Sequence, residues 1–121
     1  MTKFDILYFP FPEYLRGHYG GFVSYSNGRF RIIIDRSQSE EFQQRTLKHE
    51  YGHIMLGHVL SHDPEPDYDS PEYDAREAEA DAYADNMPDS EYDLLLSLSR
   101  KKYLDTLPEG MPEQLPEVIP A

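Results

Sequence analysis

Short apolar runs dominate the first third of the chain. Residues 6–11 form one run, and the two prolines in and after it predict an edge strand or an extended lead-in. Residues 21–26 and 29–34 are rich in β-branched and aromatic side chains, and the Asn-Gly pair at 27–28 that joins them is favoured in type I′ turns. These runs predict a small antiparallel sheet that contains an N-terminal hairpin.

The next segment, residues 39–60, has the periodicity of an amphipathic helix. Ser37 followed by Glu40 resembles a capping box, which marks the start of the helix. Apolar positions recur at helical spacing on one side, which we expect to pack on the sheet. This back face consists of Leu47, Tyr51, Ile54 and His58.

Two further helices are predicted after a polar, acidic loop. The first has Ser70 as its N-cap and Pro71 as its first residue, and it extends to Met87, before a proline. The second covers residues 90–104, with the basic run 100–102 near its C-terminal end, where cations suit the helix dipole. The leucines of this helix that we expect to face the core are Leu94, Leu95, Leu98 and Leu104.

The end of the chain has a different character. Residues 108–121 repeat the pattern Pro-Glu-x-apolar three times, which suits an extended or polyproline II arm. We therefore expect one domain over residues 1–107 and a Pro-rich extended tail over 108–121. The predicted fold class is α+β, with the small antiparallel sheet packed on the helix of residues 39–60 and two further helices.

Size and charge narrow the classes of function. A chain of 121 residues suits a single domain with a modest core. The net charge of −12, from 11 basic and 23 acidic residues, disfavours nucleic acid as a direct partner. No cysteine is present, so a metal ion would have to be held by His, Asp or Glu. No apolar span approaches the roughly 20 residues that cross a bilayer, and we expect a cytoplasmic protein without a membrane segment.

The strongest chemical signal is the pentad His49-Glu50-Tyr51-Gly52-His53. Residues four apart lie on one face of a helix, so both imidazoles can reach the same metal ion. Glu50 flanks that face, where a carboxylate can take a proton from water. Catalytic zinc is held by three protein ligands and keeps one position open, so a third ligand is required.

Two glutamates of the following helix could supply that ligand, and helical geometry separates them. Glu77 and Asp81 lie about 40° apart around the helix axis, on a face with small alanines, whereas Glu79 points about 200° away from Glu77. Gly52 allows such a face to approach the pentad helix closely. We therefore expect Glu77 to be the third ligand and Asp81 to accept the free ring N–H of a ligating histidine.

The combination of His49-Glu50-x-x-His53 with Glu77-x-Glu79-Ala80-Asp81-x-Tyr83-Ala84 and then Met87-Pro88 resembles the ImmA/IrrE family of zinc metallopeptidases. The resemblance implies a minimal zincin-like domain of the gluzincin type, and it places Glu77 as ligand and Asp81 behind the ligands. In two respects the sequence departs from the family: the segment from Ala84 to Met87-Pro88 is about two residues shorter, and a pair of leucines is absent there. Members of the family often cleave a partner repressor.

The sequence thus predicts a zinc-dependent metallopeptidase of ImmA/IrrE type with one zinc ion per chain. His49, His53 and Glu77 hold zinc, and Glu50 is the general base for a zinc-activated water that hydrolyses a peptide bond in a protein or peptide substrate, for example a transcriptional repressor. The alternative is a zinc-stabilised regulatory or interaction module without proteolytic activity. An open fourth coordination position would favour the peptidase, and a position filled by His58, an acid or the tail would favour the module or a latent enzyme.

Overall fold

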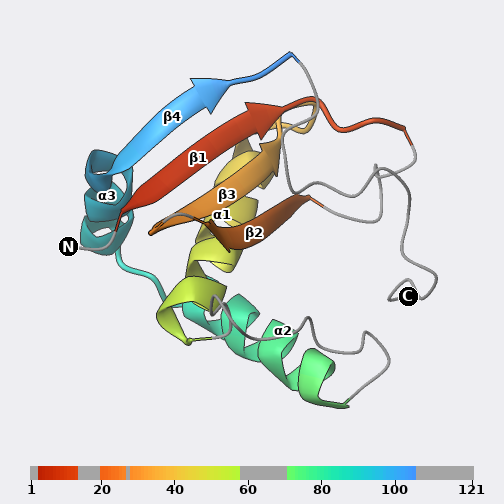
Figure 1. Cartoon of the computed structure of the whole chain (residues 1–121). Helices are drawn as coiled ribbons and strands as arrows, with labels where there is room; N and C mark the ends of the chain where they lie inside the picture. The colour runs from red at the N-terminus through yellow and green to blue at the C-terminus, as the bar shows by residue number, and fades with distance from the viewer. Residues whose placement is uncertain (1–2, 14–19, 27, 58–70, 106–121) are drawn as a thin grey trace.

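The computed structural model describes residues 3–13, 20–26, 28–57 and 71–105, which form an α+β fold, as predicted (Figure 1). Four strands form one sheet and three helices accompany it in this part of the chain. The elements are β1 Phe4–Phe9, β2 Gly21–Ser26, β3 Arg29–Asp35, α1 Glu40–Met55, α2 Pro71–Asp85, α3 Asp89–Leu98 and β4 Ser99–Tyr103. The predicted tail at 108–121 lies outside the described residues.

The predicted hairpin is present. Strands β2 and β3 pair antiparallel, with Gly21 opposite Ile34 and Ser26 opposite Arg29. Gly28, which follows the β2 strand at the turn, has φ of 78°. A side chain at this position would be strained, so glycine meets the backbone requirement of the turn.

The rest of the sheet is mixed, whereas we expected two or three antiparallel strands. The strand order is β2-β3-β1-β4, and β1 is parallel to both β3 and β4. The prediction of an edge strand near residues 6–11 is therefore wrong, because β1 is an interior strand. The two prolines, Pro10 and Pro12, follow the last residue of β1, so they end the strand and interrupt none of its ladder hydrogen bonds.

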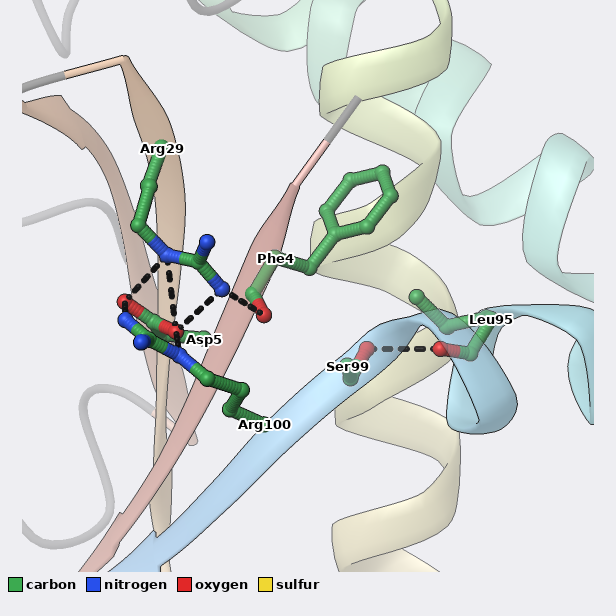
Figure 2. A network of polar contacts seen from close by, with 6 residues as sticks. All are labelled: Phe4, Asp5, Arg29, Leu95, Ser99 and Arg100. Carbon is green, nitrogen blue, oxygen red and sulfur yellow. Dashed lines mark hydrogen bonds and ion pairs between the residues drawn. The ribbon is translucent and has the colours of Figure 1, made fainter. Parts of the chain in front are cut away.

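The predicted helix at 90–104 is also wrong in its second half. Helix α3 ends at Leu98, and Ser99 is extended, with φ −101° and ψ 146°. The Ser99 hydroxyl donates a hydrogen bond to the Leu95 carbonyl oxygen at 2.6 Å, which satisfies one acceptor of the last turn (Figure 2). The basic run 100–102 then belongs to β4, because pairing with β1 outweighs the helical propensity of arginine and lysine.

The main core lies between α1 and the sheet. The predicted back face of α1 is buried at Leu47, Tyr51 and Ile54, whereas His58 lies outside the described residues. Of the leucines predicted to face this core from α3, Leu95 is buried, but Leu94 is 55% exposed and was assigned wrongly. The buried residues of this cluster are Phe4, Ile6, Ile32, Ile34, Leu47, Tyr51, Ile54, Met87 and Leu95.

Local structure at each end of α1 determines where this helix begins and ends. The side chain of Ser39, not Ser37, caps the helix by accepting from the Phe42 N–H at 3.2 Å. Ser37 instead donates to the buried Asp35 carboxylate at 2.7 Å. At the other end, α1 stops at Met55 and Gly57 has φ of 76°, the left-handed conformation that commonly follows a helix. The helix is thus shorter than the predicted 39–60.

Helix α2 begins at Pro71, the residue predicted to open it, and it ends at Asp85, slightly before the predicted Met87. The proposed cap, Ser70, lies outside the described residues. None of the helices in the described part of the chain has the length and apolar character needed to span a bilayer.

Candidate metal centre

The second half of α1 carries the pentad, and it brings the two histidine rings together. The Nε2 atoms of His49 and His53 lie 3.1 Å apart, and the rings meet edge to face with centroids 4.7 Å apart. This follows from the spacing of four residues, which returns a side chain to nearly the same face of a helix. Both nitrogens therefore point at one region of space.

Helix α2 approaches this region closely at Gly52. A Cβ atom built at Gly52 would lie 3.1 Å from the Ala80 carbonyl oxygen and 3.3 Å from the Tyr83 Cβ. The small residues thus let the two helix backbones come nearly into contact, as the sequence predicted. Figure 1 shows α2 running beside the end of α1 that carries the histidines.

Because Glu77 lies one turn before Ala80 on α2, the close approach places its carboxylate between the histidines. The Glu77 Oε2 lies 2.9 Å from His49 Nε2, and the Oε1 lies 3.1 Å from His53 Nε2. Glu79 is exposed, in keeping with its opposite direction on the helix. The structure therefore brings together His49, His53 and Glu77.

Asp81 meets the same histidine from its other side. The Asp81 Oδ1 lies 2.7 Å from His49 Nδ1, and the carboxylate itself is 66% exposed. An N–H at Nδ1 donates to this carboxylate, which fixes the ring orientation and keeps Nε2 on the side of Glu77 and His53.

The histidines and carboxylates of this cluster shift one another's pKa values. Burial alone would lower the pKa of His49, but the hydrogen bond with Glu77 and the negative charge of Glu50 raise it to about 9. Burial would raise the pKa of Glu77, and the hydrogen bonds from His49 and His53 outweigh this and lower it to about 2. At neutral pH, Glu77 is therefore a carboxylate, which is the form that binds a cation.

Glu50 is buried next to the cluster, beneath the start of β2. A Cβ atom at Gly21 would lie 3.5 Å from the Glu50 Cγ and 2.8 Å from the Thr46 Cγ2. Burial raises the pKa of the Glu50 carboxyl, while the charges of the two histidines act in the opposite direction. A carboxyl with a raised pKa beside two histidines has the character of a proton acceptor that can release its proton again.

The contact between β2 and Glu50 was not predicted from the sequence. The feature of the sequence that indicates this contact is the pair Gly20-Gly21. A Cβ at Gly20 would lie 2.9 Å from the Thr46 Oγ1, and Gly21 is equally crowded, so neither glycine has room for a side chain. The pair lets the strand lie directly on α1 and cover the stem of Glu50. A glycine pair at the start of a strand indicates such an approach, but it does not say which helix lies opposite.

The three donor side chains fit a divalent metal ion. One ligand atom from each of His49, His53 and Glu77 can be chosen so that all lie within 4.8 Å of one another. In a tetrahedral centre with zinc bond lengths near 2.0–2.1 Å, neighbouring ligand atoms lie about 3.3 Å apart. The observed separations of 2.9 and 3.1 Å are close to this value. Two neutral imidazoles and a carboxylate are also the donors that zinc takes in hydrolytic sites.

Comparison with known families identifies one match. The family described as the IrrE N-terminal-like domain, which is classed as a peptidase family, matches residues 3–111. No curated protein and no solved structure shows a significant match to the chain. The match covers all the described elements, including both helices that carry the candidate metal ligands.

Proposed function

Because the chain belongs to the family of the IrrE N-terminal-like domain, we propose that it is a zinc-dependent peptidase that hydrolyses a peptide bond in a protein partner. The observation that carries this proposal is the cluster of His49, His53 and Glu77, whose donor atoms lie within 4.8 Å of one another. The buried Glu50 beside them supplies the group that a hydrolase needs to accept a proton.

In this proposal His49, His53 and Glu77 hold zinc through Nε2, Nε2 and the carboxylate. Zinc would act there as a Lewis acid that lowers the pKa of water and polarises the carbonyl of the bond to be cleaved. Asp81 holds the His49 ring by its Nδ1–H, so that Nε2 stays in the ligating orientation. The donor set contains no thiolate, which suits a hydrolytic zinc site.

Glu50 moves the proton. Its carboxylate takes a proton from the attacking water and then delivers it to the amine that leaves as the peptide bond breaks. Burial raises the pKa of Glu50, which strengthens it as an acceptor, and its place beneath β2 limits the access of bulk water.

We propose that the partner is a regulatory protein of the cytoplasm, such as a transcriptional repressor. The support is the resemblance to the ImmA/IrrE family and the lack of cysteine, which suits a reducing compartment. The net charge of −12 supports a protein or peptide as the substrate over nucleic acid.

Metal content and cleavage test the proposal in four variants. The purified wild-type chain should carry about one zinc ion, as catalytic sites of this type hold. His49→Ala and Glu77→Ala should lose most of it, whereas Glu50→Gln should retain zinc and lose cleavage of the partner. Glu79→Gln is the matched control, since this exposed glutamate lies on the same helix and faces away from the histidines.

The partner can be found with the same variants. Glu50→Gln should retain an uncleaved partner on a column when wild-type protein releases its fragments. Wild-type zinc content in both ligand variants would contradict the site. Full zinc content with equal partner stability in wild type and Glu50→Gln would favour the zinc-stabilised interaction module over the peptidase.

A further inference from the structure

Charge is strongly segregated between the helices and one side of the sheet. Helix α2 carries six acidic residues and one basic residue, and α3 carries three acidic residues and no basic one. Strand β4, with the sequence SRKKY, carries three basic residues and no acid. In a chain with a net charge of −12, this strand is therefore a local region of positive charge.

The face of the sheet opposite α1 extends this basic region. Because side chains alternate along a strand, Arg100 and Lys102 of β4 lie on that face beside Asp5 and Leu7 of β1, and Arg31 of β3 lies beside Asp5 on its other side. Figure 2 shows Arg29 and Arg100 reaching Asp5 from two different strands. One carboxylate, 13% exposed, thus pairs with two arginines and has a third, Arg31, opposite it on β3.

The backbone of β4 adds a second property. The Leu104 N–H, just after β4, donates to the Tyr8 carbonyl oxygen at 2.8 Å. Since backbone groups point alternately to the two sides of a strand, the N–H groups of Lys101 and Tyr103 point away from β1. Strand β4 is the last in the order β2-β3-β1-β4 among the described residues, so this side is a sheet edge.

We propose that β4 is a docking edge for an extended acidic segment of a partner protein, which adds to the sheet as a further strand. Backbone hydrogen bonds to Lys101 and Tyr103 would hold the segment, as in other cases of strand addition. Its acidic side chains would face Arg100 and Lys102 on one side of the sheet, and its alternate, apolar side chains would lie on the other side. On that other side, Tyr103 is 67% exposed and stacks on Tyr8, so it offers an apolar surface to them.

The charge of β4 selects the partner. Lysines on an edge strand prevent two copies of the same edge from pairing, because like charges would face each other. The same lysines favour pairing with a strand that carries acidic side chains. The edge therefore disfavours a second copy of β4 and favours an acidic segment. Strand β2, which covers Glu50, forms the other edge of the sheet, so the docking edge is separate from the candidate metal centre.

Titration of the full-length chain with a short peptide in which Glu alternates with Val tests this inference. Amide signals of Lys101 and Tyr103 in a heteronuclear NMR spectrum should shift most, and binding should weaken as salt is raised. The peptide with Lys in place of each Glu should not bind. Lys102→Glu should weaken binding by about five- to tenfold, since a cross-strand charge pair is lost and a repulsion is gained.

Arg45→Glu is the matched control, because it makes the same change of charge at an exposed position of α1. We expect this variant to bind within about twofold of wild type. Lys101→Gln provides a second, milder variant of the edge, and it should weaken binding by less than Lys102→Glu. Equal affinities of Lys102→Glu and Arg45→Glu would overturn the proposal. So would shifts confined to other elements, preference for single-stranded DNA over the peptide, or self-association of the chain without peptide at NMR concentrations.

Discussion

Replacing Asp5 by asparagine should lower the free energy of unfolding at neutral pH by about 2–3 kcal/mol. The Asp5 carboxylate receives hydrogen bonds from Arg29 Nε at 3.0 Å and Nη2 at 2.7 Å, and from Arg100 Nε at 2.8 Å. Asparagine keeps the size of the side chain but removes its charge. Two arginines would then face each other across β1 without a counter-charge.

The two arginines should not contribute equally. Arg29 is 20% exposed and its pair with Asp5 is shielded from water, whereas the Arg100 side chain is 59% exposed. Exposed pairs are typically worth less than about 1 kcal/mol, because water and salt screen them. Most of the loss in Asp5→Asn should therefore come from the Arg29 pair, and Arg29→Met should destabilise the protein more than Arg100→Met.

The pH dependence follows from the direction of the shift. Hydrogen bonds from Arg100 and Arg29 hold the pKa of Asp5 well below its usual range, against the effect of burial. A carboxyl whose pKa is depressed in the folded state stabilises the fold above its unfolded pKa, near 3.9, and loses that contribution as pH falls toward the folded pKa. Between pH 7 and pH 3, the difference between wild type and Asp5→Asn should shrink by about 1 kcal/mol.

Urea denaturation at a series of pH values measures this difference directly. The comparison of wild type with Asp5→Asn cancels the titration of the other carboxyls, which both proteins share. Asp93→Asn, an exposed change on α3, is the control and should stay within about 0.5 kcal/mol of wild type. A difference below about 0.5 kcal/mol at pH 7, or one that is flat down to pH 3, would refute the role assigned to the two arginines.

Two further predictions concern the candidate metal centre. Asp81→Asn should lower zinc affinity by about 10- to 100-fold in a chelator competition, because His49 Nδ1 loses its carboxylate partner, and unchanged affinity would show that the contact does not orient the ring. Gly52→Val should separate α1 from α2 and weaken zinc binding through Glu77, at a cost of about 1–3 kcal/mol in the free energy of unfolding. Gly52→Val with wild-type zinc affinity would contradict this link, and a Glu79→Gln control should leave zinc affinity unchanged.

Local patterns predicted much of the fold because local forces determine those parts. Three predictions depend on only a few neighbouring residues: the Asn-Gly turn, the apolar back face of α1 and the proline that opens α2. The structure agrees with all three. Strand β4 was missed for the opposite reason. Arg100, Lys101 and Lys102 are good helix formers, and only their pairing with a distant strand makes them extended.

The position of β1 could not be predicted for a related reason. Its prolines suggested an edge, but parallel pairing on both sides depends on where β3 and β4 lie, and no turn connects β1 to either strand. The burial of Glu50 was missed in the same way, since it depends on β2 lying across α1 at Gly21. In both cases the missing information is a contact between segments that are far apart in the sequence.

The close packing of α2 on α1 could be predicted because several residues of the sequence indicate it. Gly52 removes a side chain where the helices meet, and Ala80 does nearly the same on the other helix. Once those two residues are in contact, the helical repeat sets the directions of Glu77 and Asp81, one turn before and one residue after. Glu77 must then point at the two Nε2 atoms and Asp81 at the far side of the His49 ring, as observed at 2.9 and 2.7 Å. The separation of the helices at Gly52 is therefore the quantity that controls whether the three donors can share one ion, and it is set by packing that a larger residue would disrupt.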